Sequence, residues 1–375
     1  MLIILTGGGS GGHIFPLISV AKKITTLAKE RGIEDIRFLY VGPRFDDISE
    51  EVFNREGIER AYILSSKWRR YMSSLNILDL IKLPFAMLQA IWILFWHMPD
   101  AVFSKGGYGS FPVMVASWIF FIPSRVIHES DSVPGVANRM AAPFAKRIGT
   151  AFESAALKFP VKKTAVVGLP IRDDLCGQDP KKARIFFDIV STRMVVLVMG
   201  GSQGAKKIND AITQILLKLI SKYEVIHISG PHQYEDVKNE VAVIAGADLG
   251  GYYHLYPFLT EEIKLALTLA DIVISRAGAS SIFEFAACGK PSILIPLPTA
   301  AQDHQRKNAY EYAKSGGTIV IEEDNLTPNL LYSTITSIVD DQAAIAKMSS
   351  GAAAFAMKDA SETIAKEILQ LRGVL

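Results

Sequence analysis

The sequence has only two cysteines, Cys176 and Cys288, and their separation shows no spacing typical of metal ligands. We therefore expect free thiols in a reducing compartment. Charge of one sign is not in excess either, because 40 lysines and arginines stand against 38 aspartates and glutamates, a formal net charge of +2. This balance excludes a general nucleic-acid binder. Any anionic ligand must be met by local groups.

Long hydrophobic runs are also missing. The N-terminus has no charged segment and only four or five apolar residues, too few for a secretory signal. The apolar run 83–98 has sixteen uncharged residues, whereas a membrane-spanning helix needs about twenty. We expect residues 75–98 to form helices that are part core and part membrane-interfacial, with wholly buried helices as the alternative. A further apolar run, 111–123, predicts a buried helix.

The chain contains one sequence pattern twice. Residues 2–13 and 194–205 each contain a short apolar run, glycines around a serine (Ser10 and Ser202), and then a helical pattern. The two serines lie about half the chain apart. Because 375 residues exceed the size at which single cores stop growing, we expect two similar domains facing a shared cleft.

Strand-like runs alternate with helix-like stretches, which is typical of α/β folds with parallel sheets. Strands are expected at 2–5, 37–41, 101–103, 125–128, 165–167, 194–199, 224–228, 272–274 and 292–295, and helices at about 205–222, 261–269, 281–287, 304–314 and 360–371. The sequence predicts two Rossmann-like, doubly wound domains: 1–170, a turn-rich linker 171–190, and 191–358. The amphipathic end, 359–375, is a candidate to pack back on the first domain.

The two glycine loops indicate phosphate-type sites. Gly7, Gly9 and Gly12 match the dinucleotide fingerprint, with backbone N–H groups that can approach a diphosphate. The strand 37–41 lacks the acidic residue that a nicotinamide enzyme places after it. The second loop, 200–204, lacks the lysine that a P-loop has directly after its last glycine, which argues against triphosphate hydrolysis. A tight turn without ligand contact is the alternative for the first loop.

Polar residues follow these loops at helix starts. His13 lies where the helix dipole favours a neutral imidazole, so it is suited to accept a proton, unless it only caps or packs. Ser281 and Glu284 have the spacing of a capping box. Their functional interpretation is that amides meet a phosphate while Glu284 accepts hydrogen bonds from ribose hydroxyls. Residues 301–306 either read sugar hydroxyls or form a solvated helix start.

In this order the motifs resemble those of the MurG family over nearly the whole chain. The segments that carry the resemblance are GGSGGH at 8–13 with Phe15 and Pro16, GGY at 106–108, His128 and Glu129 with Pro134, Gly135 and Asn138, GLPIR at 168–172, GGSQGA at 200–205, residues 278–284, and His304 with Gln305. One such string is weak. Their joint order is highly specific.

The resemblance implies a GT-B glycosyltransferase of peptidoglycan biosynthesis, and with it a role in cell shape and division. Such an enzyme moves N-acetylglucosamine (GlcNAc) from UDP-GlcNAc to the C4 hydroxyl of N-acetylmuramic acid in undecaprenyl-diphosphate-linked muramyl peptide, with inversion. UDP-GlcNAc is a co-substrate, and we expect no cofactor or metal because no Asp-x-Asp occurs. The implied location is cytoplasmic, peripheral on the inner face of the bacterial membrane, through Trp68, Arg69, Arg70 and the Ile77 region. Wall-synthesis enzymes are conceivable partners.

The resemblance also implies roles for single residues. Those assigned to substrates are Ser10, Gly11 and Gly12 for the sugar nucleotide, Arg172 and Ser202 for the diphosphate, Leu259 with Phe258 for uracil, Ala279, Ser280, Ser281, Ile282, Phe283 and Glu284 for phosphates and ribose, and His304 with Gln305 for the GlcNAc hydroxyls. His13 is the first candidate for the general base, with Asp131 or Glu129 as alternatives. Ser10 replaces the usual threonine, and Asp131 the usual asparagine.

Four other functions stay open. A different GT-B transferase acting on a lipid acceptor would share the glycine loops but lack the GGY and His-Glu signatures. A UDP-GlcNAc epimerase would form an epimer without an acceptor. An NAD-dependent oxidoreductase would bind nicotinamide, and a non-enzymatic lipid-surface binding protein would show no turnover.

Overall fold

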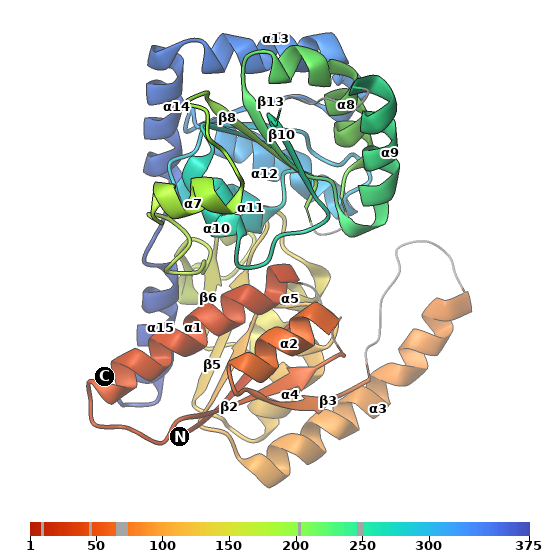
Figure 1. Cartoon of the computed structure of the whole chain (residues 1–375). Helices are drawn as coiled ribbons and strands as arrows, with labels where there is room; N and C mark the ends of the chain where they lie inside the picture. Colours follow the sequence, from red (N-terminus) through yellow and green to blue (C-terminus); the bar gives the residue numbers. More distant parts are fainter. Residues whose placement is uncertain (9–10, 45–46, 65–73, 202–203, 246–250) are drawn as a thin grey trace. The chain divides into compact units, whose positions relative to one another are not determined.

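The computed structural model describes residues 1–375 except 9–10, 45–46, 65–73, 202–203 and 246–250 (Figure 1). The chain divides into two compact units, the first made of 1–172 and 357–375 and the second of 173–356. Each unit is a parallel sheet covered by helices, which confirms the prediction of two α/β domains. The division falls after Arg172, so residues 173–190, predicted as a linker, belong to the second unit.

The first unit contains a seven-stranded parallel sheet in the order β3-β2-β1-β4-β5-β6-β7. Its strands are β1 (Leu2–Thr6), β2 (Arg37–Gly42), β3 (Glu59–Tyr62), β4 (Ala101–Ser104), β5 (Ser124–Glu129), β6 (Arg147–Thr150) and β7 (Thr164–Val166). The sequence missed β3 and β6. The first is a polar strand at the sheet edge and the second contains a glycine, so neither has a continuous apolar run.

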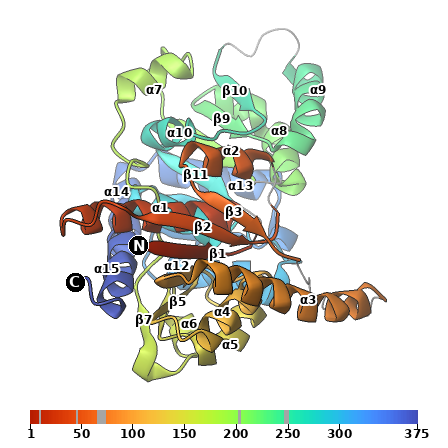
Figure 2. The same ribbon diagram turned by 90° about the horizontal axis from the view of Figure 1, so that it is seen from below.

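Helices cover both faces of this sheet. They are α1 (Gly11–Lys29), α2 (Asp47–Arg55), α3 (Ser74–His97), α4 (Ser110–Ile119), α5 (Val136–Ala141), α6 (Glu153–Ala156) and α15 (Ala360–Leu371). Side chains of successive strand residues point to opposite faces. Ile3 and Leu5 therefore pack with α1, whereas Ile4 packs with α3 and α4, as Figure 2 shows for the two sides of the sheet. The run 111–123 forms α4 only to Ile119.

The last helix, α15, packs on α1 and completes the first unit. Ile364, Ile368 and Leu369 are buried in the same cluster as Ile3 and Leu17. The Ser124 hydroxyl of β5 donates to the Ile368 carbonyl at 3.0 Å. Residues at the far end of the chain thus supply part of the core of the N-terminal sheet.

The second unit repeats this arrangement with six parallel strands in the order β10-β9-β8-β11-β12-β13. The strands are β8 (Val195–Met199), β9 (Glu224–Ile228), β10 (Tyr253–Tyr256), β11 (Ile272–Ser275), β12 (Ser292–Leu294) and β13 (Thr318–Val320), and the helices are α7 (Pro180–Phe186), α8 (Lys206–Ile220), α9 (Tyr234–Ala245), α10 (Ile263–Leu269), α11 (Ala279–Ala287), α12 (His304–Ala313), α13 (Pro328–Val339) and α14 (Gln342–Phe355). The edge strands β10 and β13 are short and half-exposed, and the sequence missed both.

The two cysteines are joined, which corrects the expectation of free thiols. Cys176 and Cys288 form a disulfide within the second unit, with their Cα atoms 5.3 Å apart. Cys288 caps the C-terminal end of α11. The two cysteines are 112 positions apart in the sequence, and no local pattern pairs them. The fold brings the segment before α7 against α11 and so places the two sulfur atoms together.

The docking of α15 predicts a stability effect confined to the first unit. Replacing the fully buried Ile368 by Ala removes core contacts and leaves a cavity, so the free energy of unfolding should fall by roughly 2–5 kcal/mol. All four tryptophans lie in residues 1–172, so their fluorescence during urea denaturation reports on that unit. The exposed Gln370→Ala on the same helix is the control, and equal midpoints for both variants would contradict the prediction.

Candidate active site

Each sheet has a point where the strand order reverses, and ligands of α/β proteins bind there, beyond the carboxyl ends of the strands. In the first unit this point lies between β1 and β4, and in the second between β8 and β11. The loops that leave these strands are the two glycine loops and the segments at 105–109 and 276–278. The predicted loops of each unit therefore lie at the reversal point of that unit's own sheet.

In the first unit, His13 lies in the opening turn of α1 beside the loop that follows β4. Its Nδ1 is 3.2 Å from the carbonyl oxygen of Lys105. Because a carbonyl can only accept, Nδ1 carries the proton and Nε2 keeps its lone pair. Burial first, and then the charge of Lys105, lower the pKa of His13 to about 4, whereas Asp131 acts in the opposite direction. The ring is a neutral base at physiological pH.

Glycine allows the two loops of this site to touch backbone to backbone. Gly107 has a φ of +89°, and a Cβ on it would lie 2.7 Å from the backbone nitrogen of Gly8. The Tyr40 hydroxyl donates to the Gly7 carbonyl at 3.1 Å and so fixes the start of the first loop. Any larger residue at 107 would push these loops apart.

Glu129, predicted as an alternative base, is engaged by its own loop. Its carboxylate accepts hydrogen bonds from the backbone N–H of Asp131 at 3.1 Å and of Gly135 at 2.9 Å. The Asn138 amide donates to it at 2.9 Å as well. Burial and the neighbouring Asp131 raise the pKa of Glu129. This carboxylate organises the loop after β5, while Asp131 is half-buried and its charge acts on His13.

Arg172 lies at the end of the first unit and faces α1. Its guanidinium is 5.1 Å from the centre of the Phe15 ring, two residues beyond His13. A cation over an aromatic face is stabilised electrostatically, which orients the arginine. Gly12 lies in the exposed first turn of α1, which begins at Gly11, and Ser10 lies outside the described residues.

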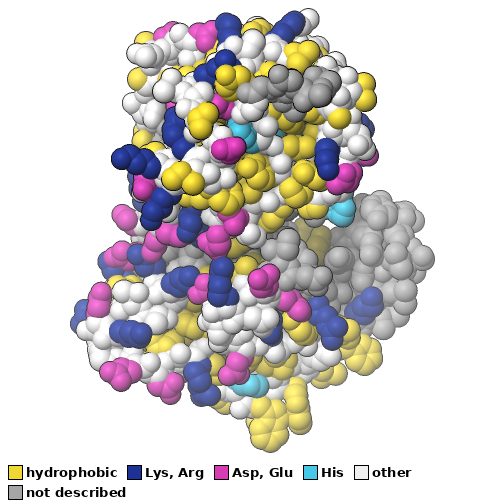
Figure 3. Space-filling view, in the orientation of Figure 1, with side chains coloured by type: hydrophobic (Ala, Val, Ile, Leu, Met, Phe, Trp, Pro, Cys, Tyr) yellow, Lys and Arg dark blue, Asp and Glu magenta, His cyan; other side chains and the backbone are white. Residues whose placement is uncertain are grey.

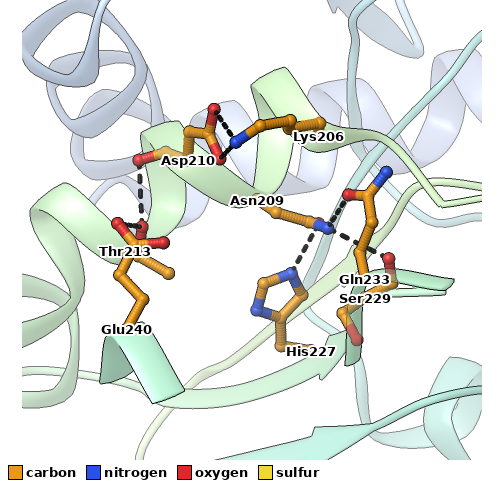
Figure 4. A network of polar contacts seen from close by, with 8 residues as sticks. All are labelled: Lys206, Asn209, Asp210, Thr213, His227, Ser229, Gln233 and Glu240. Atoms are coloured by element: carbon orange, nitrogen blue, oxygen red, sulfur yellow. Dashed lines mark hydrogen bonds and ion pairs between the residues drawn. The ribbon is translucent and has the colours of Figure 1, made fainter. Parts of the chain in front are cut away.

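In the second unit, a buried polar network supports the glycine loop after β8 (Figure 4). Asn209 of α8 donates to the Ser229 carbonyl at 3.0 Å and to Gln233 Oε1 at 2.7 Å. His227 Nε2 donates to Asn209 Oδ1 at 3.0 Å, and the Tyr253 hydroxyl donates to His227 Nδ1 at 2.8 Å.

The same network fixes the backbone against which the loop rests. A Cβ on Gly204, whose φ is +78°, would lie 2.4 Å from the Ser229 carbonyl oxygen. Sequence reasoning missed this support, although His227 in the apolar β9 was a visible signal. Ser202 lies outside the described residues.

The start of α11 corrects the capping-box interpretation. The N-cap is Gly278, and the helix begins at Ala279, so Ser281 lies inside the first turn and cannot cap it. A glycine cap has no side chain to bind the first N–H groups, and such groups favour an anion. Ser280, Ser281 and Glu284 are half-exposed, whereas Ala279, Ile282 and Phe283 are buried, so any ligand contact of those three falls to their backbone.

The segment before α12 contains two strained residues that the sequence did not indicate. Gln302 and Asp303 have φ values of 57° and 58°, a left-handed conformation that non-glycine residues adopt rarely and often at functional sites. They set the direction of the following helix start. The Gln305 side chain accepts from the Leu297 N–H at 3.0 Å, and His304 Nδ1 donates to the Ala301 carbonyl at 2.6 Å, which leaves Nε2 available.

One further hydrogen bond links α11 and α12, and burial describes the last two predicted residues. Asn308 of α12 donates to the Ala277 carbonyl at 3.4 Å, so the starts of α11 and α12 lie together. Leu259 is buried in the core and Phe258 is half-buried, which leaves the backbone of Leu259 for contact with a ligand.

Known proteins share this architecture. The glycosyltransferase family 28 N-terminal domain matches residues 3–150, and the C-terminal domain of that family matches 195–364. The UDP-N-acetylglucosamine--N-acetylmuramyl-(pentapeptide) pyrophosphoryl-undecaprenol N-acetylglucosamine transferase of Clostridium perfringens is 37% identical over 338 residues, covering 90% of this chain and 89% of the relative. The chain belongs to the MurG family.

Solved structures agree with this membership. The crystal structure of Acinetobacter baumannii MurG is 25% identical, covers 98% of this chain and 99% of its own, and has a TM-score of 0.74. The UDP-GlcNAc 2-epimerase of Neisseria meningitidis has a TM-score of 0.69 at 13% identity, with 99% of this chain and 100% of its own covered, and shows a shared fold alone.

The buried His227 predicts an acid-sensitive second unit. Burial lowers the pKa of His227 to about 3. Between pH 6.5 and 3 this histidine is therefore protonated in the unfolded chain but neutral in the folded chain. Stability should therefore fall as the pH drops from 6.5 towards 3, by up to about 1.4 kcal/mol per pH unit from this group.

Urea denaturation followed by circular dichroism at pH 4 to 7 measures this slope. His227→Gln should make it shallower, and the exposed His232→Gln should leave it unchanged. Identical slopes for wild type and His227→Gln would refute the assignment.

Proposed function

We propose that this chain transfers GlcNAc from UDP-GlcNAc to the C4 hydroxyl of N-acetylmuramic acid in undecaprenyl-diphosphate-linked muramyl peptide. The observation that carries this proposal is the likeness of 37% identity, over 90% of the chain, to a transferase named for this reaction. The residues at the reversal points of the two sheets are suited to this reaction. In the first unit His13 offers a neutral base, and in the second unit the start of α11 offers N–H groups to an anion.

His13 is the general base in this proposal. Nε2 accepts the proton of the C4 hydroxyl while that oxygen attacks the anomeric carbon of GlcNAc, and the bond from that carbon to UDP breaks with inversion. The product has a β-1,4 linkage. The neutral state of His13 supports this role, because a base must be unprotonated before the reaction.

The leaving UDP carries negative charge that must be balanced. We assign this to the N–H groups at the start of α11 and to Arg172, with Glu284 accepting from the ribose hydroxyls and Gln305 with His304 meeting the GlcNAc hydroxyls. The sequence has no Asp-x-Asp, so we propose transfer without a cofactor or a protein-bound metal. Activity should persist in EDTA.

The acceptor is lipid-linked, and we propose that α3 brings the first unit to the inner face of the membrane. In the described residues, no helix is long and apolar enough to cross a bilayer. Yet α3 carries five large apolar side chains that each expose more than half of their surface: Phe85, Leu88, Trp92, Phe95 and Trp96. Hydrophobic side chains also gather at the lower edge of the space-filling view (Figure 3).

Such a surface is unusual on a soluble monomer and typical of interfacial helices with tryptophan. Trp68, Arg69 and Arg70, which the sequence assigned to the same contact, lie outside the described residues, as does the side chain of Ile77.

A transfer assay tests the function. Radiolabelled GlcNAc from UDP-GlcNAc should appear in the lipid-diphosphate muramyl pentapeptide, and His13→Ala should lower turnover by roughly 10²-fold or more because the proton acceptor is lost. UDP-glucose is the control donor. Formation of an epimer without acceptor would replace the proposal by an epimerase, and near-normal turnover of His13→Ala would remove His13 from the base role.

Sedimentation with anionic phospholipid vesicles tests the membrane surface. The double variant Trp92→Ser, Trp96→Ser should bind several-fold less, because these side chains are 63% and 65% exposed and would insert between headgroups. Leu157→Ser, which changes an 83% exposed apolar residue elsewhere in the first unit, is the matched control. Equal binding of wild type and double variant would show that α3 does not dock.

A further inference from the structure

Lys105 is a buried lysine whose backbone and side chain serve different histidines. It follows β4 directly and is only 1% exposed. Its carbonyl accepts the hydrogen bond of His13 Nδ1. Its side-chain nitrogen lies 2.7 Å from His128 Nδ1 and 2.6 Å from the Ser130 hydroxyl. Burying a lysine is costly, so a function for its amine is to be sought.

The hydrogen bonds around Lys105 fix the proton positions. His128 Nε2 is 2.7 Å from the Gly168 carbonyl, which can only accept, so Nε2 carries the proton of that ring. His128 Nδ1 is then an acceptor, and the Lys105 amine donates to it. The side chain of Lys105 is thereby held in one place, and its carbonyl holds His13 in the tautomer with a free Nε2.

Charges near this cluster act in opposite directions. Burial is the main cause of the lowered pKa of His13; Lys105 lowers this pKa further, and Asp131, in the loop after β5, raises it. Burial lowers the pKa of Lys105 to about 7, against the attraction of Glu129 and Asp131. The lysine is therefore mostly charged below pH 7, which is the range in which protonation of His13 would disable the base.

We propose that Lys105 is a positioning residue for the transfer: its carbonyl orients His13, and its buried ammonium adds to the effect of burial in keeping His13 unprotonated beside the acidic Asp131. The proposal rests on the proposed function, in which His13 is the base. It explains why a cation is buried here at all, since a neutral side chain would pack without the desolvation cost.

The pH profile of turnover distinguishes this role from simple packing. Lys105→Gln keeps an N–H donor for His128 but loses the charge, and Lys105→Met loses both. In both variants the acid limb of the profile should move up by about one pH unit, because the repulsion of imidazolium is gone and Asp131 remains. Lys105→Arg should keep the wild-type limb, and the exposed Lys158→Met is the control. An unmoved limb in Lys105→Gln overturns the proposal.

A second measurement does not need activity. The ring nitrogens of His13, observed by ¹⁵N NMR and assigned by comparison with His13→Gln, should show the Nδ1–H tautomer in wild type. The midpoint of its titration should rise by about one unit in Lys105→Gln. An unchanged midpoint refutes the role of Lys105 even if transfer is normal. A raised midpoint in a protein without transferase activity refutes the proposed function alone.

Discussion

The burial of both faces of two parallel sheets is the constraint on which the rest of the structure depends. Ile3 and Ile4 are both fully buried although they point to opposite faces, so helices must cover each side of β1. Chain connections then leave β1 in one direction and β4 in the other, and the loops between them meet at the carboxyl edge. The apolar core thus determines where polar groups can reach a ligand.

At that edge, close backbone contact turns a fold into a site. The approach of Gly107 to Gly8 brings the loop after β4 against the first glycine loop, and only then can the Lys105 carbonyl bind the His13 ring. In the same loop, the buried amine of Lys105 lies beside the His128 ring. Burial disfavours the charged form of an imidazole, and it is the main reason why the pKa of His13 is low and its ring is neutral.

The sequence predicted much of this, for physical reasons. Strands buried on both faces, such as β8 (Val195–Met199), form continuous apolar runs and were found to within one residue, whereas edge strands such as Glu59–Tyr62 carry no such signal. Local motifs located the helix start at His13, but they placed the start of α11 two residues too late. The left-handed pair Gln302 and Asp303, the Cys176–Cys288 disulfide and the Lys105–His128 bond depend on tertiary contacts, and no local pattern encodes them.

The two units use one topology with different electrostatics. Each has a buried histidine in a strand beside its reversal point, yet His128 accepts from a lysine and His227 accepts from a tyrosine hydroxyl. The neutral network of the second unit fixes the Ser229 carbonyl, against which Gly204 of the glycine loop packs. In the proposed reaction His13 of the first unit must stay unprotonated in solvent and still accept a proton from a hydroxyl, and the nearby charge of Lys105 favours the unprotonated ring. The proposal therefore assigns a loop of fixed shape to the second unit and a buried charge to the first.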